Sequence, residues 1–332
     1  MNTSSLSNVS RRHFTSATLA AGTAILAPRR LFAGETGIVP TMIQAASQAQ
    51  IEVHRLRRNI AVLDGSGGNI AVLTGKDGKL LIDAGFTVSK PRILPALDSL
   101  SADPITRLIN THWHVDHTDG NAWLHAKGAA ITAHENTKQH LAVATRVEGW
   151  SYTFPPAPPA ALPATTFHDA LSLRHNDTSL ALQYYGPAHT DSDISVVFEE
   201  ADVIHVGDTW WNGFYPFIDY STGGSIDGMI RATKRNLTVV TDKTIIIPGH
   251  GPVGNKTGLS EYYDMLVAIR SNVSRLKKQG KSLAETIGEK PTAQVGSVSY
   301  DTRDIHQARL YGSLVRDRAG DSQERRPPNS SA

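Results

Sequence analysis

The sequence predicts an α/β protein with one main domain, and three observations support this class. Strand-like apolar runs alternate with helix-like segments along most of the 332 residues. A chain of this length can bury a sizeable core, and one domain of about 250 residues with appendages is an ordinary arrangement. No cysteine is present, so neither disulfides nor thiolate metal ligands contribute.

Residues 51–60 alternate as a strand does, and residues 69–74 and 79–83 flank a Lys76-Asp77-Gly78 turn, which predicts a hairpin. Helices are expected where apolar residues recur at helical spacing, with the longest after Gly258. The remaining expected strands are 105–110, 129–133, 180–185, 194–198, 203–206 and 244–247, and the expected helices are 91–100, 120–126, 135–143 and 225–239.

Residues 150–166 contain five prolines, which predicts an extended loop without regular structure. Such a loop is either a surface connection or a lid over a site. The five are Pro155, Pro156, Pro158, Pro159 and Pro163.

The N-terminus is typical of an export signal. Ser10-Arg11-Arg12-His13-Phe14 is a twin-arginine pattern, and the apolar run 17–27 is shorter than the roughly 20 residues that a membrane-spanning helix needs. We expect a signal peptide over residues 1–33, twin-arginine export, a periplasmic or secreted protein, and no membrane span. The alternative is a disordered basic tail on a cytoplasmic protein.

The sequence from His112 to His117 places three imidazoles and the carboxylate of Asp116 within six positions. Imidazole suits zinc or iron, and a carboxylate suits a hard cation or a second metal. Three further residues, His189, Asp208 and His250, each follow a predicted strand and enter a turn. Because strand ends converge in α/β sheets, all seven side chains together could hold two metals. Six histidines lack such spacing and are expected to be structural or exposed: His125, His134, His140, His168, His175 and His205.

These motifs, in this order over residues 51–255, resemble the metallo-β-lactamase superfamily. The resemblance implies a four-layer αββα sandwich, with Asp83 supporting the ligands from behind. It assigns His112, His114 and His189 to a first metal, Asp116, His117 and His250 to a second, and Asp208 to both. The implied organisation is a linker at 34–50, a catalytic domain at 51–257, a C-terminal helical extension packed on it at 258–316 and a disordered tail at 317–332.

The resemblance implies two Zn²⁺ ions per chain, with iron or manganese as alternatives. A metal-bridging hydroxide would attack a small ester, thioester or lactam-type substrate, since zinc lowers the pKa of bound water from 15.7 to about 7. Asp116 would serve as a ligand and as a candidate proton acceptor. Asp208 resembles the hydroxyacylglutathione-hydrolase type rather than the β-lactamases that use a cysteine ligand. A true β-lactamase and an iron-dependent sulfur dioxygenase or other oxidoreductase remain alternatives.

The expected partner is a small-molecule substrate, and the sequence leaves the oligomeric state open. The net charge of +2 and the predicted export argue against a nucleic acid. The stretch 210–220 is rich in aromatic residues and is either a substrate pocket or the edge of the core. Its candidate pocket residues are Trp210, Trp211, Phe214 and Tyr215, and Thr118 and Asp119 are expected to hydrogen-bond metal ligands. The basic residues of the helix after Gly258 (Arg270, Arg275, Lys277 and Lys278) form either a solvated face or a site for an anionic substrate.

Overall fold

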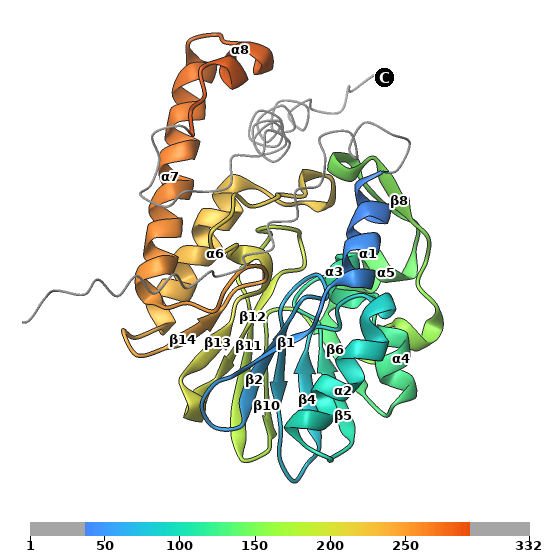
Figure 1. Ribbon diagram of the computed structural model, residues 1–332. Coiled ribbons are helices and arrows are strands. Elements are labelled where there is room, and N and C mark those ends of the chain that lie inside the picture. The colour runs from blue at the N-terminus through green and yellow to red at the C-terminus, as the bar shows by residue number, and fades with distance from the viewer. Residues whose placement is uncertain (1–36, 293–332) are drawn as a thin grey trace, which may run out of the picture. The chain divides into compact units, whose positions relative to one another are not determined.

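The computed structural model describes residues 37–292. Two sheets pack face to face in this part of the chain, and helices cover the outer face of each, which confirms the predicted α/β class and the four layers (Figure 1). The predicted signal peptide, the disordered tail and the end of the helical extension lie outside the described residues. No helix within residues 37–292 is long and apolar enough to cross a bilayer.

The first sheet has seven strands in the order β1-β2-β3-β4-β5-β6-β9. The expected hairpin is β3–β4, which pair antiparallel, whereas β4, β5, β6 and β9 run parallel to one another. The strand expected over 51–60 is instead two strands, because Arg58 and Asn59 adopt positive φ angles and turn the chain back. The strands are β1 (Glu52–Arg55), β2 (Ile60–Asp64), β3 (Ile70–Leu73), β4 (Lys79–Ile82), β5 (Ile105–Ile109), β6 (Ala130–His134) and β9 (Thr165–Phe167).

The second sheet has five strands in the order β10-β11-β12-β13-β14. Its first strand was not expected, and it forms a hairpin with β11 through Asn176 and Asp177, both at positive φ. The last pair, β13–β14, is parallel, so β11, β13 and β14 all run in one direction. The strands are β10 (Ala170–His175), β11 (Thr178–Tyr184), β12 (Ile194–Phe198), β13 (Val203–His205) and β14 (Ile245–Ile247).

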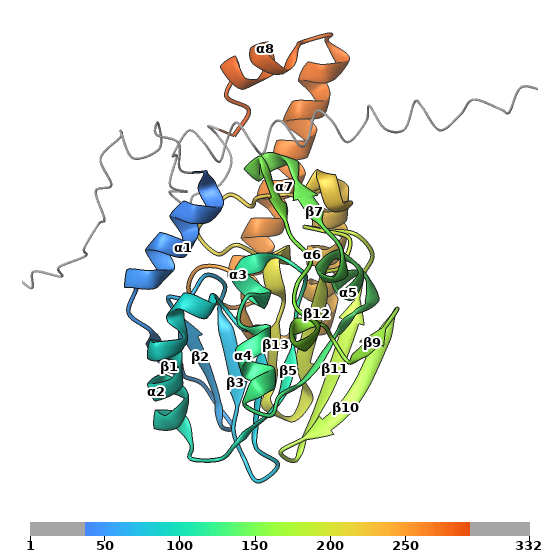
Figure 2. The ribbon, with the colours of Figure 1, turned by 90° about the vertical axis from the view of Figure 1, so that its right-hand side faces the viewer.

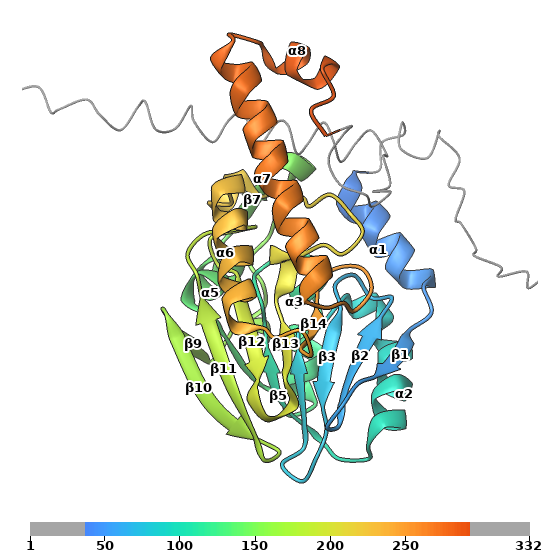
Figure 3. The ribbon, with the colours of Figure 1, turned by 90° about the vertical axis from the view of Figure 1, so that its left-hand side faces the viewer.

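Three apolar layers hold the sandwich together. The middle layer lies between the sheets and includes Ile82 and Val196, which are fully buried. Helices α2 (Lys90–Leu100) and α4 (Asn121–Ala126) cover the first sheet (Figure 2). Helices α6 (Ile226–Val239) and α7 (Lys256–Lys278) cover the second (Figure 3). Burial of these apolar surfaces is the main source of stability, at roughly 25 cal/mol per Å².

Three regions lie outside this frame. The range expected as a linker contains helix α1 (Ile38–Gln48), whose Val39 is 1% exposed. The proline-rich range is more regular than expected: β8 (Tyr152–Phe154) pairs with β7 (Thr145–Val147), and residues 159–161 form a 3-10 turn. The five prolines fall between β8 and β9 and therefore remove no ladder hydrogen bond. Beyond α7, helix α8 (Leu283–Gly288) begins with a capping box made by Ser282 and Glu285.

Candidate metal centre

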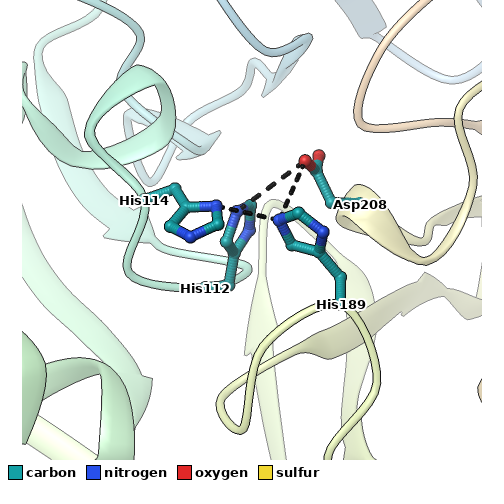
Figure 4. Close-up of side chains that lie close together, drawn as sticks. All are labelled: His112, His114, His189 and Asp208. Atoms are coloured by element: carbon teal, nitrogen blue, oxygen red, sulfur yellow. Dashed lines mark hydrogen bonds and ion pairs between the residues drawn. The ribbon is translucent and has the colours of Figure 1, made fainter. Parts of the chain in front are cut away.

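The seven side chains singled out from the sequence come together at one edge of the sandwich. They form two groups, and the ligand atoms within each group lie within 4.8 Å of one another. The first is His112, His114, His189 and Asp208, drawn in Figure 4, and the second is Asp116, His117 and His250.

Parallel strands bring these residues together. The chain leaves β5 into the loop with His112 and His114, and the one-turn helix α3 (Val115–Thr118) then carries Asp116 and His117. His189, Asp208 and His250 follow β11, β13 and β14, which run in the same direction. Their carboxyl ends therefore open at a common edge, where α/β sheets place ligands.

Two glycines allow the backbone to approach the ligands closely. A Cβ at Gly68, in the loop between β2 and β3, would lie 2.1 Å from Cε1 of His117. A Cβ at Gly249 would lie 1.9 Å from Oδ1 of Asp208. Neither position has room for a side chain, so both glycines are required by the packing around the centre.

Two imidazoles are anchored by a network around Asp83. This buried carboxylate lies 2.8 Å from Nδ1 of His117 and accepts hydrogen bonds from the amide and the hydroxyl of Thr111. The hydroxyl of Thr111 in turn lies 3.0 Å from Nδ1 of His112. Both rings therefore turn Nε2 toward the centre, and Asp83 has the supporting position that the resemblance implied.

The other two imidazoles of the first group are anchored by residues near the end of the aromatic stretch. Nδ1 of His189 donates to the carbonyl oxygen of Phe217 at 2.7 Å, and Nε2 of His114 lies 3.1 Å from Oδ2 of Asp219. The free nitrogens, Nδ1 of His114 and Nε2 of His189, lie 2.8 Å apart at the centre. Asp219 was missed by sequence reasoning because it is 105 residues from His114, and its only signal was its place at the end of the aromatic run.

The residues fit a bound cation. Nε2 of His112 and Oδ1 of Asp208 are buried and have no hydrogen-bond partner within the described part of the chain. The carboxylate of Asp208 lies between the two groups, with Oδ2 3.3 Å from Nε2 of His189 and Oδ1 3.2 Å from Nε2 of His117. Unpartnered buried polar atoms are costly, and metal ions coordinated here would satisfy them.

Burial and the neighbouring charges shift the pKa values of the side chains in both groups, often in opposite directions. Burial lowers the pKa of His112 and lowers that of His189 to about 4, which keeps both rings neutral and able to coordinate. Burial alone would raise the pKa of Asp116, but His117 and His250 outweigh it and lower this pKa to about 2. Burial would likewise lower the pKa of His250, but Asp208 and Asp116 raise it to about 9. Burial would also raise the pKa of Asp208, but His250 and His117 hold it well below its usual value. The carboxylates of Asp116 and Asp208 are therefore both ionised at neutral pH.

Thr118 and Asp119 behave differently from the expectation. The hydroxyl of Thr118 donates to the carbonyl oxygens of Trp113 and His114, not to an imidazole. Oδ2 of Asp119 accepts from the amide of Thr87 at 2.7 Å, so it ties the end of α3 to another loop. Both residues hold the backbone of the ligand loop, and among the hydrogen bonds of residues 37–292 neither bonds a ligand side chain.

The four aromatic residues proposed for a pocket divide into two pairs. Trp210 and Tyr215 are 1% and 5% exposed and belong to the core beneath α6 and α7. The ring of Trp211 lies 4.4 Å from that of His250, and Phe214 is 43% exposed. Only the second pair is therefore placed to meet a substrate.

The proline-rich segment borders a cavity of about 330 Å³ rather than the metal centre itself. Trp113 and Val115 line it together with Phe154 and Pro156 of the proline-rich side. The six histidines that lack ligand spacing interact with groups other than the seven candidate ligands. His205, for example, lies 3.1 Å from the carbonyl oxygen of Asn69.

Comparison with known proteins agrees with this geometry. The profile of the metallo-beta-lactamase superfamily matches residues 63–254. Similar solved structures include a metallo-beta-lactamase from Pontibacter korlensis, with 18% identity and a TM-score of 0.54 over 66% of this chain and 99% of that one. The DIM-1 metallo-beta-lactamase has 18% identity and a TM-score of 0.53 over 66% and 97%. The sec-alkylsulfatase Pisa1 from Pseudomonas sp. has 14% identity and a TM-score of 0.58 over 86% and 54%. At these identities the structures show the shared fold, and the profile covers more than half of the sequence: the chain belongs to the metallo-β-lactamase superfamily.

Proposed function

We propose that this protein is a dinuclear zinc hydrolase that cleaves a small ester, thioester or lactam-type substrate. The observation that carries the proposal is the pair of side-chain groups that meet at Asp208. Nitrogen and oxygen donors without sulfur suit zinc, and iron or manganese would accept the same set.

Two zinc ions bound here would supply hydroxide at neutral pH and polarise the substrate oxygen. The protein's own contribution is to fix the donors. Asp83 and Asp219 hold His117 and His114 in the tautomers that leave the inward nitrogens free. Asp116, with a side chain 5% exposed and an oxygen 3.2 Å from Nε2 of His250, stays ionised and can accept a hydrogen bond from an attacking water.

The twin-arginine segment supports a further part of the proposal, namely export to the periplasm or the medium. Such a protein would fold and load its metal before translocation, and the signal would be cleaved near Ala33 once it had directed export. Sequencing the N-terminus of the protein recovered from each cell fraction tests this part; an intact N-terminus found only in the cytoplasm would contradict it.

Metal analysis of the natively purified protein, combined with a substrate panel, tests the enzymatic proposal. We expect close to two equivalents of zinc, and turnover of an aryl ester, a thioester or a chromogenic cephalosporin that stops when the metal is chelated. His114→Ala and Asp208→Ala should each lower the rate at least about a hundredfold, whereas replacement of the exposed His54 by alanine should not.

The same panel separates the alternatives. Turnover of the cephalosporin alone would identify a β-lactamase, and an alkyl sulfate belongs in the panel because of the similar sulfatase fold. Iron in place of zinc, with oxygen uptake in the presence of a persulfide, would replace the hydrolase with a sulfur dioxygenase. Metal-free protein, or hydrolysis unaffected by both substitutions, would overturn the proposal.

A further inference from the structure

The metal centre reaches the surface at His250. Its side chain is 20% exposed and that of Asp116 is 5% exposed, whereas those of His112, His117 and His189 are fully buried. A substrate that reaches the centre must therefore arrive beside His250, and the residues around it determine what fits.

Trp211 is the neighbour of His250 at this point. The two residues form an isolated parallel bridge, and their rings lie 4.4 Å apart at an interplanar angle of 46°. The indole nitrogen of Trp211 is buried and has no acceptor among residues 37–292. The indole face would contact apolar atoms of a substrate that arrives beside His250.

Apolar side chains continue outward from Trp211. Phe214, three residues later, is 43% exposed, and its Cε2 lies 3.2 Å from the place where Gly251 would carry a Cβ. Ile38 and Met42 of α1 are partly buried and pack on the same apolar cluster as Trp211. Helix α1 lies at the end of the sandwich where α3 begins (Figure 2). Two parts of the sequence, residues 38–42 and 211–214, thus present apolar groups on this side.

The ligand carboxylates have histidines as their ion-pair partners within the described ranges. Every ion pair that Asp116 and Asp208 form there is with a histidine, and none is with lysine or arginine. Among the basic residues of α7, Arg270 hydrogen-bonds Asp227 at 2.7 Å. A carboxylate at the far end of an acyl chain would lose its hydration against the apolar side chains of Trp211 and Phe214.

We propose that the substrate carries an uncharged, apolar acyl group next to the bond that is cleaved, and that Trp211 and α1 hold this group. Trp211 is a specificity-determining residue, and α1 forms the facing wall. This inference rests on the proposed hydrolase function and narrows it to neutral esters or lactones, away from anionic lactams and glutathione thioesters.

A matched pair of esters tests the charge preference. 4-Nitrophenyl butyrate and 4-nitrophenyl hemisuccinate have four-carbon acyl groups and the same leaving group, but only the second carries a carboxylate. With the full-length, zinc-loaded protein, kcat/KM should be at least tenfold higher for the butyrate. It should also rise from the acetate to the octanoate, because each buried CH₂ contributes up to about fourfold.

Substitutions at Trp211 and Met42 test which side chains cause the chain-length preference. Trp211→Ala should reduce kcat/KM for the octanoate at least tenfold more than for the acetate, and Trp211→Phe should retain most of the chain-length preference. Met42→Ser should weaken the preference in the same direction, while Gln44→Ser, at an exposed position of the same helix, should leave it unchanged. Binding of 2-decanone, measured by isothermal titration calorimetry, supplies a readout without turnover and should weaken in Trp211→Ala.

Each outcome decides a separate point. Equal turnover of butyrate and hemisuccinate, or an unaltered chain-length preference in Trp211→Ala with its zinc content intact, would overturn this inference and leave the hydrolase standing. If the zinc-loaded protein hydrolyses no member of the wider panel, the hydrolase proposal fails and this inference fails with it. If Trp211→Ala does not fold, Trp211→Phe and Met42→Ser decide the question.

Discussion

Nε2 of His114 lies 3.1 Å from Oδ2 of Asp219, which links the ligand loop to a segment 105 residues further along the chain. Asp219 is itself held by the hydroxyl of Thr222 at 2.7 Å and the amide of Ser221 at 3.1 Å. Burial alone would raise the pKa of Asp219, but the hydrogen bond with His114 and its other donors lower it, so the carboxylate is ionised. An ionised acceptor fixes the proton of His114 on Nε2 and leaves Nδ1 for a metal.

Asp219→Asn should therefore weaken metal binding at the first group. An amide is a poorer acceptor than a carboxylate, and the loss of such supporting residues typically costs about 10–100-fold in metal affinity. Competition with a chromophoric chelator measures the affinity of each equivalent, and one equivalent should weaken while the other is retained. Asp98→Asn, at an exposed position of α2, is the control. Unchanged affinity of both equivalents would show that Asp219 has no such role.

Asp83→Asn should weaken the other side of the centre and also destabilise the fold. Asp83 lies 2.8 Å from Nδ1 of His117 and accepts two hydrogen bonds from Thr111, all within the buried interior. Asparagine tolerates the φ of 68° at this position, so the backbone is preserved and only the acceptor changes. An unsatisfied buried group costs about 1–3 kcal/mol, which urea unfolding of metal-free protein would detect. A midpoint equal to that of the wild type would contradict this account.

Gly68→Ala tests the close approach of the β2–β3 loop to His117. The added Cβ would lie 2.1 Å from Cε1 of the imidazole, so the ring or the loop must move. Binding of the second metal should weaken at least about tenfold, because the inward Nε2 moves with the ring. Gly288→Ala adds the same atom where no heavy atom lies within 4 Å, and it should retain both metals. Full metal content in Gly68→Ala would mean that the loop adjusts freely.

The grouping of the seven candidate ligands was predictable from the sequence, because they follow apolar strands whose ends the alternation of strands and helices places together. The supporting role of Asp219 was not predictable, because it depends on how the 217–224 segment folds back onto His189 and His114. The sequence also did not show that Trp210 is in the core while Trp211 lies beside His250. Adjacent residues in an extended segment face opposite sides, and only the packing of α6 and α7 shows which side is the core. The single strand expected over 51–60 was wrong because the chain turns at Arg58 and Asn59. Both adopt positive φ angles, and the turn contains no glycine that would have indicated it in the sequence.

His134 should make stability depend on pH below neutrality. It caps α5 (Glu135–Ala142) by accepting a hydrogen bond from the amide of Asn136 at 3.2 Å, and its ring stacks on Tyr184 at 4.0 Å. Burial lowers its pKa from the usual value of 6.5, so the unfolded chain binds the proton more readily than the folded one. The contribution of this residue is therefore complete above pH 6.5 and is lost as the pH falls through the lowered pKa in the folded state.

Thermal unfolding of metal-free protein between pH 8 and pH 5 measures this effect. His134→Asn retains a capping acceptor that does not titrate, so its melting temperature should fall less over this range than that of the wild type. The difference should be of the order of a helix cap, about 1 kcal/mol. His54→Asn, which replaces a histidine with a side chain 49% exposed, should follow the wild type. Parallel curves for wild type and His134→Asn would show that the cap survives protonation, and the acid sensitivity would then have to come from another buried histidine, such as His175.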